Sequence, residues 1–412
     1  MPKTYDTLII GGCAAGLCAA IRLKQKNKSL NVAILEQLPR VGKKLITTGN
    51  GRCNITNRDI NTERYHGENV EFAEYALQKY NNVVIEDFFN CLGVPFFYDE
   101  QGRAYPYSLQ ASSVVDALRF ATEELGVETY IQTTVSDYEK TQNGFRLKTS
   151  NGDFFGKTVI AASGLCSGGK ALGSTGDLLS ILKKHGYNTV NTTPAIVQIK
   201  TEPSVVRSLK GIKVNADATL TVDKKTVRRE NGEVLFCDYG LSGPPILQIS
   251  RSVERTDGVV SVVLDLMPEF SFGDIVNMLE MRSSNLIKRN LDEFFTGFLN
   301  KRVGQAVIKM CGLKLSDSVS TLKSADIKAL ADKIKRMSFA VTGTTGFDNS
   351  QVTAGGLNTD SFQNTTMMSK REKGMYAVGE ILDIDGDCGG FNLQWAWSSA
   401  MCAADSIFEW LK

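Results

Sequence analysis

The residues best suited to chemistry lie in a glycine-rich turn near the start of the chain. An apolar run at residues 8–10 leads directly into Gly-Gly-Cys-Ala-Ala-Gly at residues 11–16. A turn of this kind between a buried strand and a helix directs backbone N–H groups at one spot, which suits a pyrophosphate. Glu36 ends a second apolar run at residues 32–35, about 20 residues after the turn, where dinucleotide-binding units place an acid on a ribose hydroxyl. The sequence therefore predicts a dinucleotide site here.

The turn departs from the usual G-x-G-x-x-G pattern because Cys13 occupies the middle glycine. That glycine normally lets the backbone approach the pyrophosphate, so we expect the Cys13 side chain to force a shift or to weaken the contact. The alternative interpretation is a glycine turn that only packs a strand on a helix.

Two further segments combine glycines with polar side chains. Residues 42–57 hold glycines, amides and three cations in one loop, and residues 383–394 include Gly389 and Gly390 before a helix with an apolar stripe. The bare N-terminus of that helix suits negative charge. Both segments are expected to face the same ligand.

Composition excludes several classes of protein. Lys and Arg number 47 against 45 for Asp and Glu, a net charge of +2, so we expect no nucleic-acid or membrane partner. Nine cysteines without a C-x-x-C pair indicate reduced thiols and a cytoplasmic location, and no signal peptide or membrane-spanning run is apparent. With only His66 and His185, neither a histidine-based triad nor a metal site is expected, and we assign both histidines structural roles.

Four apolar segments predict the strands of a parallel sheet, at residues 8–10, 32–35, 158–162 and 375–378. They predict an α/β Rossmann-like domain made of residues 1–194 and 337–412. The intervening residues 195–336 predict an inserted domain that is β-rich over 195–270 and helical over 271–336. Its helical part includes an apolar set at Leu291, Phe294, Phe295 and Phe298.

Five longer motifs resemble a known family, the BaiN and aminoacetone-oxidase-like NAD(P)/FAD-dependent oxidoreductases. The motifs are Thr48-Gly49-Asn50-Gly51-Arg52-Cys53-Asn54, Gly173-Ser174-Thr175-Gly176-Asp177, Gly240-Leu241-Ser242-Gly243-Pro244, Val352-Thr353-Ala354-Gly355-Gly356, and Gly379-Glu380 with Gly389-Gly390-Phe391-Asn392-Leu393-Gln394. The resemblance runs through nearly the whole chain. It implies a two-dinucleotide-binding-domain flavoprotein fold, non-covalent FAD, and an inserted β-barrel plus helical domain that covers the flavin.

The resemblance also implies which residues bind the FAD. The turn residues would meet the pyrophosphate, Glu36 and Gln37 the adenosine ribose, and Val135 the adenine, while the C-terminal residues would hold the ribityl chain and the pyrimidine edge. The complete expected set is Gly11, Ala14, Ala15, Gly16, Glu36, Gln37, Lys44, Gly49, Asn50, Arg52, Cys53, Val135, Gly164, Gly379, Glu380, Gly390, Phe391, Asn392 and Leu393.

We expect an FAD-dependent oxidoreductase acting on a small molecule, either oxidising an amine or reducing the C=C bond of an enone or steroid-like intermediate. The alternative is a flavin-binding redox sensor or partner-binding protein without turnover. NAD(P)H is compatible as the reductant, but no second glycine motif supports it, and the oligomeric state stays open. Asp238, where the family usually has His, is the candidate proton carrier, against a structural role for a loop aspartate.

Overall fold

The computed structural model describes residues 3–412 and divides them into two compact units. Unit 1 contains the chain up to residue 194 together with residues 347–412, and unit 2 contains residues 195–346. The predicted boundary at residue 337 is wrong, because β17 (Met337–Thr344) is a strand of unit 2. Unit 1 therefore resumes at Phe347.

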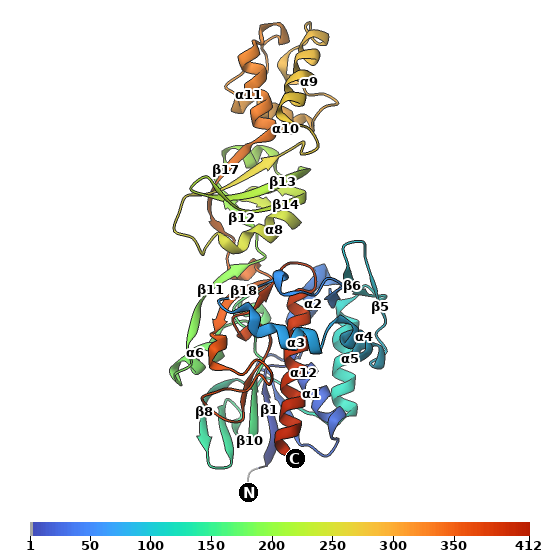
Figure 1. The fold of residues 1–412 in the computed structure, drawn as a ribbon, viewed down its shortest axis with the longest axis vertical. Coiled ribbons are helices and arrows are strands. Elements are labelled where there is room, and N and C mark those ends of the chain that lie inside the picture. Colours follow the sequence, from blue (N-terminus) through green and yellow to red (C-terminus); the bar gives the residue numbers. More distant parts are fainter. Residues whose placement is uncertain (1–2) are drawn as a thin grey trace. The chain divides into compact units, whose positions relative to one another are not determined.

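A mostly parallel sheet forms the centre of unit 1 (Figure 1). β10 pairs in parallel with β1 and β19, and β1 and β2 continue the parallel sheet to β7. β9 and β8 extend it in antiparallel pairing from the first half of β10. The strands are β1 (Thr4–Ile10), β2 (Val32–Leu35), β7 (Glu128–Tyr130), β8 (Val135–Thr141), β9 (Gly144–Thr149), β10 (Gly152–Ala161) and β19 (Met375–Ala377).

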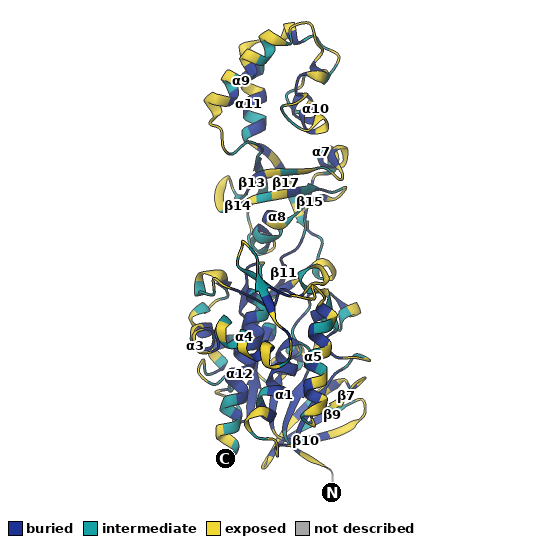
Figure 2. Ribbon diagram, turned by 90° about the vertical axis from the view of Figure 1, so that its right-hand side faces the viewer, coloured by how far each residue is buried: buried dark blue, intermediate teal, exposed yellow. Residues whose placement is uncertain are grey.

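Helices α1 (Ala14–Lys26) and α12 (Phe391–Leu411) are the most deeply buried helices of this unit (Figure 2). Most residues of α12 are buried, as expected for a helix enclosed by other elements, and its Trp395 and Trp397 are fully buried. Arg22 and Asp405 join the two helices through two hydrogen bonds of 2.7 and 2.9 Å. The sheet and these helices thus form one apolar core.

Shorter elements surround the core of unit 1. The helices are α2 (Lys43–Thr47), α3 (Glu74–Lys79), α4 (Asn82–Cys91), α5 (Ala111–Glu124) and α6 (Asp177–Lys184). Three small sheets pair β3 (Thr56–Asn57) with β6 (Arg103–Pro106) and β5 (Phe96–Tyr98), β4 (Tyr65–His66) with β20 (Asp385–Gly386), and β11 (Thr189–Ala195) with β18 (Val352–Leu357). The β4–β20 pair joins chain segments more than 300 residues apart.

Unit 2 consists of a closed six-stranded barrel and five helices, three of which lie in the chain between the barrel strands β16 and β17. The barrel strands are β12 (Ile199–Thr201), β15 (Gly240–Ser242), β14 (Lys225–Phe236), β13 (Lys213–Val222), β16 (Val260–Asp265) and β17. The helices are α7 (Pro203–Val206), α8 (Pro244–Ile249), α9 (Phe272–Asn285), α10 (Lys301–Met310) and α11 (Ser324–Lys335). The predicted fold class, an α/β Rossmann-like domain with a β-barrel and helical insertion, is confirmed.

The apolar set at residues 291–298 does not form the predicted helix. Residues Leu291–Glu293 make one turn of 3-10 helix, and the following residues make turns. Arg282 of α9 donates hydrogen bonds to the carbonyl oxygens of Phe294 and Thr296, which removes acceptors that a continuing helix would need. Gly297 then adopts a positive φ of 78°, so the segment turns back.

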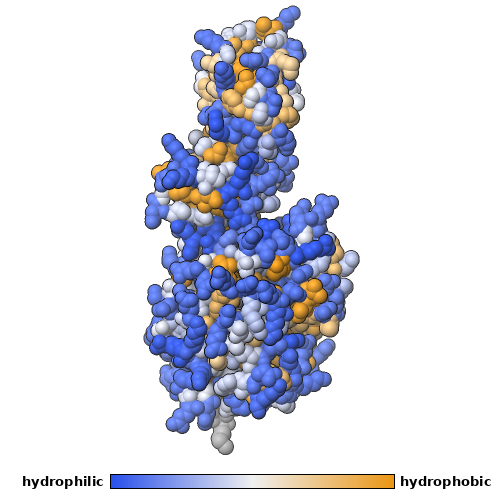
Figure 3. All heavy atoms as spheres, viewed as in Figure 1, coloured by the Kyte–Doolittle hydropathy of each residue, from blue (hydrophilic) through white to orange (hydrophobic). Residues whose placement is uncertain are grey.

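Hydrophilic residues cover most of the face of unit 1 seen in Figure 3, and hydrophobic residues gather there only in small patches. Among residues 3–412, no helix is both long enough and apolar enough to cross a membrane.

Candidate functional site

The glycine turn of unit 1 is built by close backbone contacts. Gly11 adopts a φ of 107°, and its N–H donates to Leu35 O at 2.9 Å, which ties the turn to the end of β2. A Cβ on Gly16 would lie 1.9 Å from the carbonyl oxygen of Gly11, so α1 can start this close to β1 only with glycine there. No side chain caps α1, and its first turn has no acidic residue. The N-terminus of α1, formed by Ala14, Ala15 and Gly16, is therefore suited to bind an anion.

The backbone conformation at Cys13 is compatible with a side chain, and the effect of that side chain on the pyrophosphate contact stays a prediction. The Cys13 φ of −111° and ψ of −157° lie in the extended region that any residue adopts, so the backbone does not require glycine at this position. Burial raises the pKa of the Cys13 thiol, and the side chain stays neutral at neutral pH. The thiol therefore adds no negative charge at the start of α1.

We expect Cys13→Gly to change the FAD dissociation constant by less than about threefold, because the backbone conformation is already compatible with both residues and glycine is tolerated at a helix N-cap. Titration of the apoprotein with FAD, followed by flavin fluorescence, measures this. A tenfold change in either direction would show that the Cys13 side chain contacts the cofactor.

Glu36 is held rigidly at the end of β2. Its two carboxylate oxygens accept hydrogen bonds of 2.8 Å from the N–H groups of Gly12 and Leu38, and its side chain is buried. Burial raises the pKa of Glu36, and the two backbone donors oppose that rise. Gln37 donates to Gly173 O, and Thr133 N–H donates to Glu36 O at 2.9 Å. The segment that leads to Val135 therefore lies beside Glu36.

Glu36→Gln is expected to weaken FAD binding about 10- to 100-fold, because a charge-assisted hydrogen bond to the ribose is worth roughly 1.5–3 kcal/mol. Glu100→Gln, at an exposed position, is the matched control and should bind FAD with the affinity of the wild-type protein. Titration of both apoproteins with FAD measures the two affinities. Equal FAD affinities of the two variants would show that Glu36 does not bind the ribose.

Lys44 and Glu380 form an ion pair that is largely shielded from water. Each side chain is only 20% exposed, and Ser167 bonds to both, donating to Glu380 Oε1 at 2.6 Å. Thr353 N–H donates to the same oxygen at 3.1 Å. A Cβ on Gly164, which has a φ of 64°, would find no atom closer than Glu380 Oε2 at 4.0 Å. The backbone at residue 164 therefore borders open space beside the ion pair.

The loop at residues 49–53 contains several left-handed residues. Gly49, Asn50 and Cys53 have φ values of 57°, 55° and 60°. For the two residues other than glycine such a conformation costs about 1 kcal/mol or more, and it is often found at functional sites. Arg52 is exposed, and its guanidinium lies 4.7 Å from the centre of the Tyr105 ring. The loop thus presents a cation on an aromatic ring.

The N-terminus of α12 is fixed by contacts from several segments. Gly390 has a φ of 101°, and a Cβ there would lie 2.3 Å from Thr56 O. The Asn54 amide, in the orientation that satisfies its neighbours, accepts from Gly390 N–H at 3.1 Å. Asn392 bonds to Gly386 N–H at 2.8 Å and to Gly386 O at 2.7 Å. No side chain caps α12. Its N-terminus, which includes Phe391 and Leu393, is therefore a second helix end that could bind an anion.

Gly379 places its backbone against the same helix. Trp395 donates to Gly379 O at 3.1 Å, and Gly379 N–H donates to Ser399 at 2.9 Å. Its φ of 70° and a Cβ distance of 3.2 Å to Ala15 exclude a larger residue. Gly379 thus joins the start of α1 to α12, next to Glu380.

Asp238 occupies a different environment. It lies in unit 2 on the turn between β14 and β15, its side chain is 53% exposed, and Lys210 donates to it at 2.6 Å. Lys210 lowers the pKa of Asp238, so this carboxylate is ionised at neutral pH. Such a group accepts protons poorly, which weighs against the proposed proton carrier.

Asp238→Asn is therefore expected to leave turnover within about threefold of the unchanged protein, on whichever substrate the protein uses. A general acid or base would lose roughly 10²- to 10⁴-fold, so the two roles are easily distinguished by steady-state kinetics. A loss in that range with normal flavin content would establish Asp238 as the proton carrier.

A contact between His66 and Asp387 could not be predicted from the sequence. His66 Nε2 lies 2.8 Å from Asp387 Oδ1, and Asp387 is nearly buried. His185, at the C-terminal end of α6, makes a similar 2.7 Å contact with Asp137. The described residues contain no group of three or more His, Cys, Asp or Glu side chains arranged to hold a metal ion.

These features fit an FAD molecule. Two uncapped helix ends suit its pyrophosphate and its pyrimidine edge, Glu36 is fixed where a ribose would bind, and glycines stand where a Cβ would obstruct the backbone. Four of the predicted residues, Gly11, Glu36, Gly164 and Gly379, follow the carboxyl ends of β1, β2, β10 and β19. Each contact with FAD remains a prediction.

Comparison with known proteins decides the family. The model of the HI0933-like protein Rossmann domain matches residues 5–406. The chain belongs to this family. It is 32% identical over 404 residues to a 3-dehydro-bile acid delta(4,6)-reductase of Clostridium scindens, covering 97% of this chain and 98% of that protein. It is 30% identical to a ribosomal RNA dihydrouridine synthase of Escherichia coli, covering 98% of each.

The solved structures agree with the fold. The E. coli quinol fumarate reductase FrdA subunit superposes with a TM-score of 0.53 at 15% identity, covering 99% of this chain and 71% of that one. The resemblance stated from the motifs is confirmed, and the protein is an FAD-dependent oxidoreductase. The alternative of a flavin-binding protein without turnover is set aside.

Proposed function

We propose that this protein reduces a C=C bond conjugated to a carbonyl group in a small molecule, with non-covalently bound FAD. One observation carries the proposal. Two full-length relatives are named for different substrates, yet both names describe saturation of such a bond: the delta(4,6) bonds of a 3-keto steroid, and the 5,6 bond of uridine beside its C4 carbonyl. The bond type is what a shared site would conserve.

The roles of this chain's residues follow from their positions. The N-terminus of α1 binds the pyrophosphate, Glu36 the ribose, and the N-terminus of α12 the pyrimidine edge, where its N–H groups stabilise added negative charge. The ion pair of Lys44 and Glu380 joins α2 to the segment that follows β19. Bound FAD supplies the two-electron chemistry, and the protein supplies orientation and electrostatics.

Anaerobic half-reactions test the proposal. The yellow protein is reduced with NADH, NADPH or dithionite and then mixed with 2-cyclohexenone, 4-androstene-3,17-dione, or dioxygen. We expect rapid reoxidation by at least one enone, with the saturated ketone as product. Aminoacetone is mixed with the oxidised protein in parallel, and bleaching by this amine without enone reduction would replace the proposal with amine oxidation.

A uridine within RNA is the second candidate substrate, and one surface feature favours it. The exposed guanidinium groups of Arg52 and Arg58 lie 4.7 Å and 4.6 Å from the ring centres of Tyr105 and Tyr98, and an unstacked base can stack on a guanidinium plane. The balanced charge of +2 favours a small molecule instead. Mixing the reduced protein with a uridine-rich RNA loop, and analysing its nucleosides for dihydrouridine, separates the two.

A further inference from the structure

His66 and Asp387 are brought together by a strand pair that also leads into the candidate site. β4 pairs with β20 so that His66 lies opposite Asp385, and Asp387 N–H donates to Arg64 O at 2.8 Å just beyond the pair. The glycines that precede α12 begin two residues later. Backbone hydrogen bonds, and not only side chains, therefore fix the dyad.

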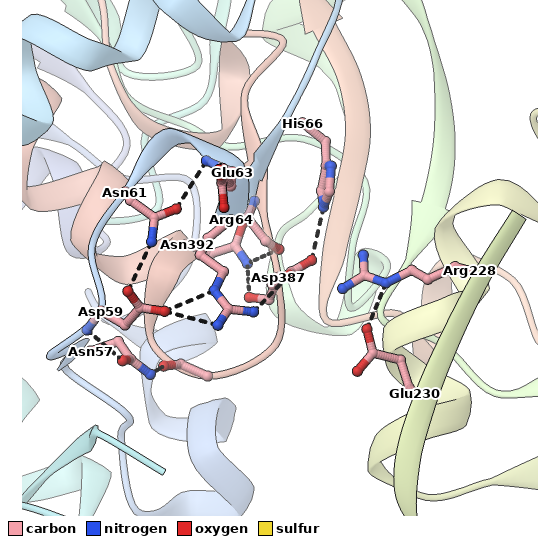
Figure 4. A network of polar contacts seen from close by, with 12 residues as sticks. Asn57, Asp59, Asn61, Glu63, Arg64, His66, Arg228, Glu230, Asp387 and Asn392 are labelled. Atoms are coloured by element: carbon pink, nitrogen blue, oxygen red, sulfur yellow. Dashed lines mark hydrogen bonds and ion pairs between the residues drawn. The ribbon is translucent and has the colours of Figure 1, made fainter. Parts of the chain in front are cut away.

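The dyad and the N-terminus of α12 form one rigid arrangement (Figure 4). Asn392, in the first turn of α12, donates to the backbone carbonyls of Gly386 and Asp387 at 2.7 and 3.3 Å. Tyr65, the neighbour of His66, donates to Phe391 O at 3.1 Å. His66 is thus anchored to the helix end assigned to the pyrimidine edge of the flavin.

The burial of the two side chains suits proton transfer. The Asp387 side chain is 5% exposed and the His66 side chain is 26% exposed, so a shielded carboxylate orients an imidazole that solvent can reach. A carboxylate bound to one ring nitrogen fixes the tautomer and stabilises the protonated ring. This is the arrangement of a general acid or base with its orienting partner.

Further charged side chains lie close to the dyad. Arg64 Nη1 lies 3.8 Å from Asp387 Oδ2, and Arg64 is also paired with Asp59 at 2.8 Å. Asp383 approaches the next residues of the chain, accepting from Glu68 N–H at 2.8 Å. Arg64 therefore links Asp387 of the dyad to Asp59.

We propose that His66, oriented by Asp387, donates the proton in the reduction. The inference rests on the proposed function. Bound reduced FAD would supply a hydride, with its two electrons, to one carbon of the C=C bond. The π electron pair then forms the second new C–H bond, at the other carbon, with the proton of His66. The N–H electron pair stays on the imidazole, and water restores its proton. Asp387 is the positioning residue.

The chain provides its own control. His185 and Asp137 form a second dyad with nearly the same distance, but it lies at the end of α6, and both its side chains are 28% exposed. Since these are the only two histidines, isotope-labelled histidine gives two imidazole signals, which His66→Gln and His185→Gln assign. His66 lies beside the N-terminus of α12, whereas His185 lies at the end of α6. The experiments below compare the two histidines.

The first measurement locates His66 without using turnover. Imidazole spectra of the FAD-loaded protein are recorded before and after reduction with dithionite. Reduction changes both the ring currents and the charge of the flavin, so the His66 signals should shift while those of His185 stay in place. Unshifted His66 signals would overturn the placement, whether or not any enone is reduced.

The second measurement tests the proton. His66→Gln should slow enone-dependent reoxidation of the reduced protein roughly 10²- to 10⁴-fold, the usual contribution of a general acid, and should slow reoxidation by dioxygen, which needs no proton at a substrate carbon, far less. His185→Gln should alter neither rate. Asp387→Asn should also slow the enone-dependent reoxidation, because the imidazole loses the carboxylate that orients it, and Asp387→Glu should restore the rate partly.

The outcomes separate the two proposals. Reduced protein that reacts with no enone contradicts the proposed function, and the imidazole spectra then decide by themselves whether His66 lies at the flavin. An enone rate in His66→Gln equal to that of the unchanged protein overturns the proton role. Flavin content and thermal melting confirm that each variant folds. If His66→Gln does not fold, the enone rate of Asp387→Asn tests the proton role of His66 instead.

Discussion

Gly16→Ala is expected to yield protein without bound FAD, or no folded protein at all. The new Cβ would lie 1.9 Å from the carbonyl oxygen of Gly11, well inside the contact distance of two heavy atoms. Backbone rather than a flexible side chain is in the way, so the end of β1 or the start of α1 must move. Overpacking of this kind costs about 3 kcal/mol or more, and it displaces the helix end that binds the pyrophosphate.

Gly273→Ala is the matched control. Gly273 also lies near the start of a helix, α9, but its nearest neighbour to a new Cβ is Ser271 Oγ at 3.8 Å. Alanine should be neutral there or stabilising by up to about 1 kcal/mol, since it favours the helix. The ratio of flavin to protein absorbance and thermal melting test both variants. Gly16→Ala with full flavin content and an unchanged melting temperature would contradict the close approach.

The sheet of unit 1 could be predicted because parallel strands that are buried on both faces consist of consecutive apolar residues. The predicted run at residues 32–35 coincides with β2, and residues 8–10 form the end of β1. The glycine turn could be predicted as well, since its spacing follows from how a strand must enter a helix. These features depend on residues close together in the chain.

Features that depend on distant contacts could not be predicted. The helix expected at residues 291–298 is absent because Arg282, from another element, occupies the carbonyl groups of that segment. His66 and Asp387 are 321 residues apart, and only the pairing of β4 with β20 brings them together. Asp238 looked suitable by residue type alone, whereas its exposure and its pairing with Lys210 appear only in the fold.

Lys44 and Glu380 illustrate how a predicted residue can gain a second role. The sequence placed both at the cofactor, and the structure joins them in a shielded ion pair that also includes Ser167. Breaking such a pair from one side leaves a charge with poor solvation, which is more costly than removing both charges together. The pair therefore contributes to stability as well as to the site.

Lys44→Met is expected to lower the free energy of unfolding by about 2–3 kcal/mol, because Glu380 then keeps its charge with only Ser167 and the Thr353 N–H as partners. Glu380→Gln should lower it by a similar amount. The double variant should lose less than the sum of the two single losses, since no uncompensated charge remains. Urea unfolding of the four apoproteins gives the coupling energy without any contribution from bound FAD.

The exposed pair of Lys412 and Glu409 provides the control for this cycle. Its side chains are 54% and 67% exposed, so Lys412→Met should cost no more than about 0.5 kcal/mol. Lys44→Met should also weaken FAD binding at least tenfold if Lys44 lies along the phosphates, whereas Lys412→Met should not. A stability loss in Lys44→Met without a loss of FAD affinity would assign Lys44 to the fold alone, and additive losses in the double variant would contradict the ion pair.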